Sequence, residues 1–204
     1  MSLASAATAR ADNRQAIEAL QTAASLETLA RANYRSALPL DQVRSAPPLV
    51  ARFNLTTSEQ HFAHFNTLND AITQRGGLAQ AHPDIPVANK IAEMLPHVPD
   101  GGLVAVVDVA IYLEERLYAT HVKFAQSVSD PKLRLLFISI AGVEAQHLAV
   151  LRNTRVLVQS GLEGQIALPP PDLHRLPPAA STDPLQHAFA PTGLARPLSE
   201  GAVG

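Results

Sequence analysis

Hydrophobic residues recur at steps of three and four in four long segments of the chain, which predicts four amphipathic helices. The predicted helices span residues 13–38, 49–75, 100–128 and 131–160. A shorter helix is predicted at residues 87–95, where Val87, Ile91 and Leu95 share a face. The apolar residues are mainly Ala, Leu and Val with only 4% aromatics, which suits close helix packing more than a β-sandwich, so the expected fold class is all-α.

Local signals mark the ends of these helices. Asp12 is the predicted N-cap of the first helix, and the pair Gly76–Gly77 is the predicted C-cap of the second. Asp130 followed by Pro131 predicts an N-cap with proline at the first helical position, and Gly161 lies beyond the last helix. These limits predict a flexible N-terminus at 1–12, a helical domain at 13–161 and a separate tail at 162–204.

The loop lengths predict the topology. Short loops join the first helix to the second and the third to the fourth, so each pair forms an antiparallel hairpin. The middle connection of roughly 20 residues contains four prolines and lets the second hairpin cross over and pack on the first. The prediction is therefore a four-helix bundle with one long crossover.

The tail at 162–204 differs in composition, because it holds eight of the 16 prolines of the chain. We expect it to be extended, and either disordered alone or laid along a partner or a neighbouring subunit. A terminus without any role is the alternative.

Ionisable residues interrupt the apolar face of all four predicted helices. A buried carboxylate or imidazole is costly unless it has a partner, and four intrusions at matched heights indicate a shared polar centre. A metal site is the first candidate for such a centre. Its candidate ligands are Glu27, His61, His64, Glu114, Glu144 and His147.

The two hairpins also show a weak internal duplication. His61-x-x-His64-x-x-x-Leu68 corresponds to Glu144-x-x-His147-x-x-x-Leu151. Residues at i and i+3 project from one helix face, so Glu144 and His147 can reach the same ion. Mixed carboxylate and imidazole ligands suit iron, manganese or zinc better than calcium or magnesium.

Composition excludes several other classes of protein. The formal charge of −2 and the pI near 6.4 give no electrostatic basis for binding nucleic acid. No apolar run is long enough to predict a membrane span. Cysteine is absent, which excludes thiolate metal sites. The two methionines lie off the apolar faces of the four predicted helices, so no haem is expected.

The chain as written has no signal peptide and is expected in the cytoplasm, with export to the cell envelope as the alternative.

These motifs resemble the ferritin-like superfamily, in particular its small bacterial ferritin-like domain proteins. The segment Ser139–His147 is the most characteristic match, and Ala23–Glu27 is the next. The resemblance covers roughly residues 13–161. It implies a four-helix bundle with a Glu on helices one and three and a Glu-x-x-His on helices two and four, and by position it implies ligands at Glu27, His64, Glu114, Glu144 and His147.

His61 departs from this family pattern, which has Glu at that position. A neutral imidazole binds one ion through a single lone pair, whereas a carboxylate can bridge two ions. The shell becomes three Glu and three His, which leaves one ion, an asymmetric pair or no metal all open. The alternative to ligation is a surface ion pair for Glu144 with His147, and a buried carboxylate bonded to a Tyr or His for Glu27 and Glu114. His61 and His64 could instead be satisfied core histidines, or His61 a solvated residue at the edge of its stripe. Tyr34 and His121 are either outer partners of the ligands or ordinary core residues, and the second interpretation is preferred.

Two functional hypotheses follow. The first is a metal-binding ferritin-like protein with one or two ions of iron, manganese or zinc, an oxidoreductase of the ferroxidase or peroxide type if it is an enzyme. The second is a metal-free ferritin-like scaffold that acts as an interaction or envelope-associated module. In either case a homodimer or small homo-oligomer is expected, formed through the bundle or the tail.

Overall fold

A computed structural model describes residues 3–167, 177, 179 and 191–203, without the side chains of residues 3–6. Over the described residues it is helical and has no strand. The long helices are α1 (Leu3–Ala37), α3 (Pro48–Gln74), α5 (Val98–Ser127) and α6 (Pro131–Gln159). The connections hold α2 (Asp41–Arg44), α4 (Ile85–Met94) and the 3-10 turns Leu95–His97 and Glu163–Gln165.

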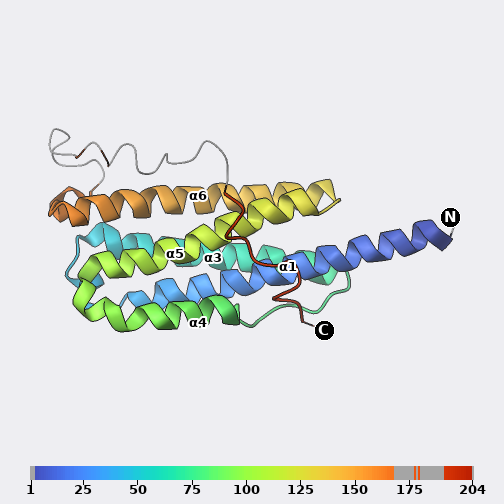
Figure 1. Cartoon of the computed structure of the whole chain (residues 1–204), viewed down its shortest axis with the longest axis horizontal. Helices are drawn as coiled ribbons and strands as arrows, with labels where there is room; N and C mark the ends of the chain where they lie inside the picture. The colour runs from blue at the N-terminus through green and yellow to red at the C-terminus, as the bar shows by residue number, and fades with distance from the viewer. Residues whose placement is uncertain (1–2, 168–176, 178, 180–190, 204) are drawn as a thin grey trace.

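The bundle has the predicted topology (Figure 1). Helix α1 packs on α3 and α5 packs on α6, so each hairpin is antiparallel, and α1 contacts α5 where the hairpins meet. The crossover contains α4, which packs against α5. The all-α bundle of two hairpins joined by a long crossover is therefore confirmed.

Most helix ends follow the capping signals. The Asp130 carboxylate accepts a hydrogen bond of 2.8 Å from the Lys132 amide and caps α6. After α3 the chain turns at Gly76, whose φ of 79° suits glycine, and the Gly77 amide donates to the Ile72 carbonyl at 3.0 Å. Helix α5 begins two residues before the predicted Asp100 and is kinked at Gly102, where φ is 63°.

The predicted start of α1 was wrong. The helix begins at Leu3, nine residues before Asp12, so Asp12 is not an N-cap, and residues 3–12 belong to the helix instead of forming a separate segment. This part of α1 projects beyond the bundle (Figure 1), and its described side chains, from Ala7 to Asp12, are exposed. Residues 3–9 are mostly alanine with no glycine or proline, and alanine is the best helix former.

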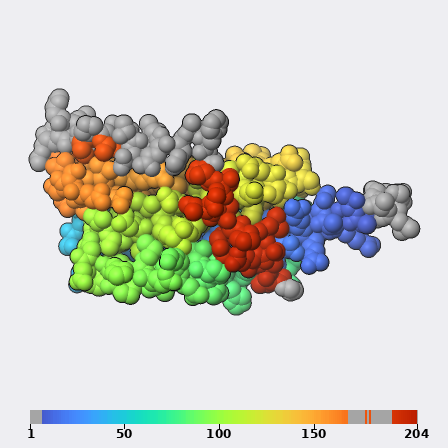
Figure 2. All heavy atoms as spheres, in the orientation of Figure 1, coloured from blue at the N-terminus to red at the C-terminus, as the bar shows by residue number. Residues whose placement is uncertain are grey.

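The end of the proline-rich tail is attached to the bundle of its own chain. Residues 191–203 cross α5 and lie along α1, as the red segment of Figures 1 and 2 shows. The Thr22 hydroxyl donates to the Leu198 carbonyl at 2.8 Å and accepts from the Gly201 amide at 2.8 Å. Gly201 lies so close to α1 that an added Cβ would meet the Thr22 Cα at 2.6 Å. The sequence predicted a tail that is free or bound to another chain, whereas the structure attaches residues 191–203 to their own bundle. The rest of the tail, apart from residues 162–167, 177 and 179, lies outside the described residues.

Arg196 makes this attachment sensitive to mutation. Its guanidinium pairs with the buried Asp84 carboxylate at 3.1 Å, and Asp84 also caps α4 by accepting from the Val87 amide. Replacing Arg196 with Gln leaves a buried carboxylate without its cation, so we expect the free energy of unfolding to fall by about 1–3 kcal/mol. Urea denaturation tests this, with Arg35→Gln as the control because Arg35 is exposed. Equal stability of the two variants would contradict the proposed role of the Arg196–Asp84 pair.

Two helices also meet the length and composition criteria of a membrane span. They lie within Ile85–Ser127 and Pro131–Gln159. Core helices of a soluble bundle meet the same criteria, and α5 and α6 place Glu114 and Glu144 inside the bundle with no exposed surface. The absence of a membrane span stays a prediction.

Candidate metal centre

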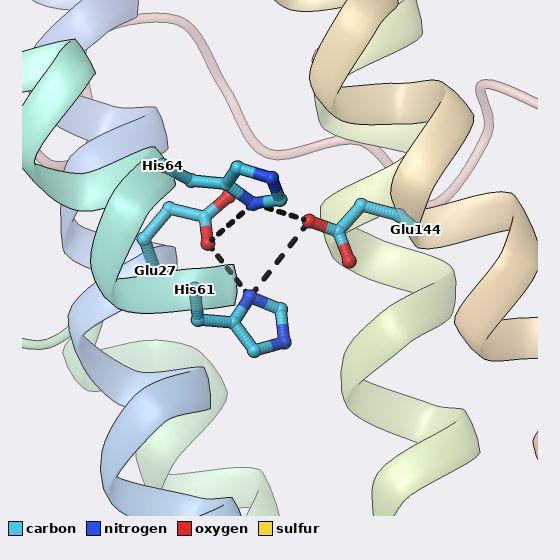
Figure 3. A group of neighbouring side chains, drawn as sticks. All are labelled: Glu27, His61, His64 and Glu144. Carbon is cyan, nitrogen blue, oxygen red and sulfur yellow. Dashed lines mark hydrogen bonds and ion pairs between the residues drawn. The ribbon is translucent and has the colours of Figure 1, made fainter. Parts of the chain in front are cut away.

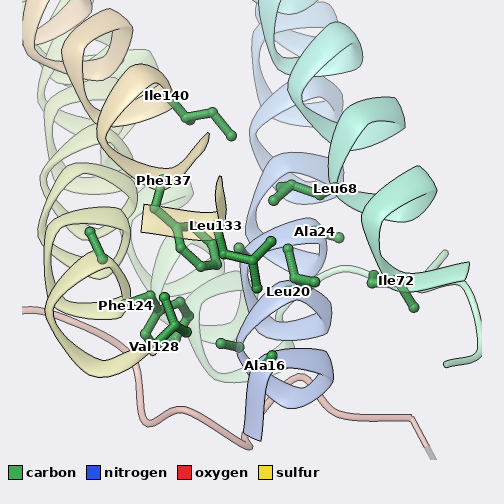
Figure 4. Close-up of a cluster of buried hydrophobic side chains, with 13 residues drawn as sticks. Ala16, Leu20, Ala24, Leu68, Ile72, Phe124, Val128, Leu133, Phe137 and Ile140 are labelled. Carbon is green, nitrogen blue, oxygen red and sulfur yellow. The ribbon is translucent and has the colours of Figure 1, made fainter. Parts of the chain in front are cut away.

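The six predicted ligands lie together at mid-height of the bundle. Helix α1 contributes Glu27, α3 contributes His61 and His64, α5 contributes Glu114, and α6 contributes Glu144 and His147. All but His64 are buried, and His64 is half-buried. Two apolar clusters flank the centre. One contains Leu20, Leu68, Phe124 and their neighbours (Figure 4), and the other contains Tyr34, Val107 and Leu151.

The ligand atoms form two overlapping groups, each with atoms within 4.8 Å of one another. The first group is Glu27, His61, His64 and Glu144 (Figure 3), and the second is His61, Glu114, Glu144 and His147. His61 and Glu144 belong to both groups.

His61 lies between the two groups and presents one ring nitrogen to each hairpin. Its Nδ1 lies 2.7 Å from Glu27 Oε2, and its Nε2 lies 3.2 Å from Glu114 Oε1. Glu144 uses its two oxygens in a similar way, because Oε1 lies 3.1 Å from His64 Nδ1 and Oε2 lies 2.9 Å from His147 Nδ1. The internal duplication of the two hairpins thus appears as two sets of donors that share His61 and Glu144.

Partners outside these groups fix the orientation of the ligands. His147 Nε2 donates to Gln60 Oε1 at 2.8 Å, which leaves Nδ1 facing the carboxylates. The Tyr34 hydroxyl donates to Glu114 Oε1 at 2.5 Å, and the Tyr34 ring stacks on His61 with a centroid distance of 5.5 Å. Such outer hydrogen bonds are typical of metal ligands, because they set the tautomer of a histidine and the rotamer of a carboxylate.

His121 joins the cluster, against the preferred interpretation of the sequence. Its Nδ1 donates to the Leu117 carbonyl at 2.8 Å, so the free lone pair is on Nε2, which lies 3.4 Å from Glu27 Oε1. Both of these facing atoms are buried and lack a hydrogen-bond partner. The position of His121 on the same stripe as Glu114 was the available signal, but a stripe does not show which side chain of another helix it meets. Gln60 gave no signal, since it lies beside the stripe.

Burial and mutual charge shift the pKa values in opposite directions. Burial would raise the pKa of Glu27, but the charge and hydrogen bond of His61 prevail and lower it to about 2. The pKa of Glu144 rises to about 7 through burial and the charge of Glu114. Burial would lower the pKa values of His64 and His147, but the carboxylates of Glu27, Glu114 and Glu144 that face them raise both to about 9. Burial lowers the pKa of His121 to about 4.

In the metal-free protein, protons bound to the imidazoles thus balance the charge of the carboxylates. Three carboxylates face three imidazoles, His61, His64 and His147, whose pKa values all lie above the ordinary value. A divalent ion bound among these atoms would displace protons from the imidazoles, so its affinity would increase with pH.

The raised histidine pKa values predict how the stability of the metal-free protein depends on pH. A histidine with a folded pKa near 9 contributes stability that is complete below its unfolded value of 6.5 and is lost as the pH rises through 9. We expect the free energy of unfolding to fall by about 2–5 kcal/mol between pH 7 and pH 9. Urea titrations of chelator-treated protein check this, and the His64→Gln variant should lose less stability over the same range. A flat profile would contradict protonated histidines in the folded state.

Comparison with known proteins identifies the family. The ferritin-like domain family matches residues 15–156, so the chain belongs to this family. Neither a search of curated proteins nor a search of solved structures found a match. The match covers most of the bundle, from within α1 to near the end of α6, and ends before the tail, in agreement with the resemblance in the sequence.

Proposed function

We propose that this protein binds one or two transition-metal ions of the iron type in the core of its bundle. The ligands would be Glu27, His61, His64, Glu114, Glu144 and His147. The two overlapping groups of donors support two ion positions. Iron is the preferred metal, with manganese and zinc as alternatives, because the donors are carboxylates and imidazoles without a thiolate.

The observation that carries this proposal is a set of buried polar atoms without hydrogen-bond partners. They are Glu27 Oε1, His64 Nδ1, Glu114 Oε2, His121 Nε2 and Glu144 Oε1, of which His64 Nδ1 and Glu144 Oε1 face each other at 3.1 Å as an ion pair without hydrogen-bond geometry. Buried polar atoms in a protein core are nearly always satisfied, so five orphans in one cluster indicate a missing partner. A cation satisfies carboxylate oxygens and imidazole lone pairs at once, which a hydrogen-bond donor cannot do for so many acceptors. His121 is a candidate additional ligand beside Glu27 on the same grounds.

The chemistry that suits such a centre is the oxidation or sequestration of iron, or the turnover of dioxygen or peroxide. A bound iron ion would supply the redox step. The chain would hold the ion, while the apolar surroundings limit water and the Tyr34 hydroxyl holds a proton at Glu114 Oε1.

Metal analysis tests the proposal. Full-length protein expressed with added iron, manganese and zinc should retain close to one or two equivalents of one metal, and less than about a tenth of an equivalent would contradict it. The matched pair is Glu114→Gln and Glu115→Gln. Glu115 is adjacent in sequence but pairs with Arg152 at 3.0 Å outside the cluster, so only the first variant should lose metal.

A metal-free scaffold is the second candidate function, and the charge balance between three carboxylates and three imidazoles favours it. In that case His61 would remain protonated where the family has a carboxylate. Addition of ferrous, manganous or zinc ions to chelator-treated protein would then leave the melting temperature unchanged, whereas ligand binding to the folded state raises it.

A further inference from the structure

A cavity of about 260 Å³ lies next to the candidate metal centre, between α1, α3, α5 and α6. Its walls are almost entirely apolar and include Val107, Leu151 and Ile166. None of the six candidate ligands lines it, but Tyr34, Val107 and Leu151 from the apolar surroundings of the centre do. Apolar cavities of this kind hold small ligands in many proteins.

Two aromatic side chains form the wall between this cavity and the metal centre. Tyr34 and Phe53 both line the cavity, and their rings meet edge to face at a centroid distance of 6.1 Å. On the other side Tyr34 stacks on His61, and Phe53 packs against His147 at 6.1 Å. A molecule in the cavity would therefore be one side-chain layer from the candidate ligands.

Two polar residues of the cavity lie at its mouth, while the polar lining residue Asn54 is buried. Arg52 and Thr56 line it and are exposed, as is Val150, so the cavity opens to the surface there. Among the residues that the structure describes, Arg52 makes no ion pair and no lining residue is acidic. A free guanidinium at the mouth of an apolar cavity matches a ligand with an apolar chain and an anionic head.

We propose that this cavity binds a single-chain carboxylate of medium length, with the chain against Tyr34 and Phe53 and the carboxylate at Arg52. A methylene group takes up about as much space as a water molecule does in the liquid, about 30 Å³. The cavity of about 260 Å³ therefore has room for a chain of roughly eight to ten carbons. The binding of this ligand requires no metal. If the proposed function is also correct, the bound ligand would lie one side-chain layer from the metal ions, close enough to act as a regulator or as a substrate of the centre.

Calorimetric titration of chelator-treated, full-length protein with decanoate tests the proposal, with decan-1-ol and acetate as matched ligands. Decanoate should bind one per chain, decan-1-ol should bind more weakly, and acetate should not bind. Arg52→Gln should weaken decanoate binding about three- to tenfold and change decan-1-ol binding less than about twofold. Equal affinity of wild type and Arg52→Gln for decanoate would overturn the assignment of the head group.

A second pair of variants tests the location. Thr154→Phe places a ring in the cavity and should abolish binding of both long-chain ligands, whereas Thr67→Phe places the same ring on an exposed face of α3 and should bind normally. Circular dichroism establishes that both variants fold. Normal binding to Thr154→Phe, or no binding of decanoate to wild type, would overturn the proposal. Because no metal is present, none of these outcomes depends on the proposed function.

Discussion

Replacing Glu144 with Gln is expected to remove metal binding at both candidate positions while leaving the fold intact. Glu144 belongs to both ligand groups and offers one oxygen to each, so its loss affects two ions at once. Even the outer partners of metal ligands are worth 10–100-fold in affinity, so we expect a loss of about 100-fold or more for this shared ligand. Competition with a chromophoric chelator measures the loss for each metal.

The same substitution should cost little stability in the metal-free protein. The pKa of Glu144 is raised to about 7 by burial and by the charge of Glu114, so its carboxyl is already partly neutral at neutral pH. The neutral amide of Gln reproduces that state and has a similar shape. We expect the free energy of unfolding to change by less than about 1 kcal/mol, because His64 keeps its contact with Glu27 at 3.5 Å and His147 keeps its contact with Glu114 at 3.4 Å. A large loss of stability together with a loss of metal would instead indicate that Glu144 has a structural role.

The periodicity of the sequence was sufficient to predict the bundle and the convergence of the six side chains. Helical spacing places Glu27, Glu114 and Glu144 on buried faces, and the loop lengths fix which helices are neighbours. These features depend on local pattern, which a sequence shows directly. That these residues bind metal stays a prediction.

The parts that the sequence did not predict depend on contacts between distant segments. The Gly201 amide meets the Thr22 hydroxyl, although 179 positions separate them, and the tail shows no pattern that signals this contact. His121 lay on a recognised stripe, but its approach to Glu27 depends on the relative heights of α1 and α5. The start of α1 was missed for a different reason, because Asp12 resembles a cap although the alanine-rich residues before it favour helix.

Glu27 should respond to the same chemical change in the opposite way from Glu144. The Glu27→Gln substitution is expected to destabilise the metal-free protein strongly at pH 7, because Glu27 is ionised in the folded state with a pKa of about 2. Burial opposes this ionisation, and the charge and hydrogen bond of His61 outweigh the burial. Removal of the carboxylate therefore takes from the buried His61 imidazolium its shortest contact, the 2.7 Å hydrogen bond to Glu27, which costs about 3 kcal/mol when converted from the shift below 4.5.

The pH dependence separates this electrostatic effect from a simple packing defect. A carboxylate whose folded pKa is depressed contributes stability above its unfolded pKa of 4.5, and this contribution is lost as the pH falls toward 2. The difference in unfolding free energy between wild type and Glu27→Gln should therefore be constant from pH 7 to about pH 5 and should shrink below pH 4.5. Urea denaturation at pH 7, 5 and 4 measures it, with Glu144→Gln as the matched variant. A difference that stays constant down to pH 4, or equal losses of stability in the two variants, would show that Glu27 is not the ionised member of the cluster. In that case the protons would be distributed differently among the carboxylates. The first ion position would then lack the negative charge that the proposed centre requires.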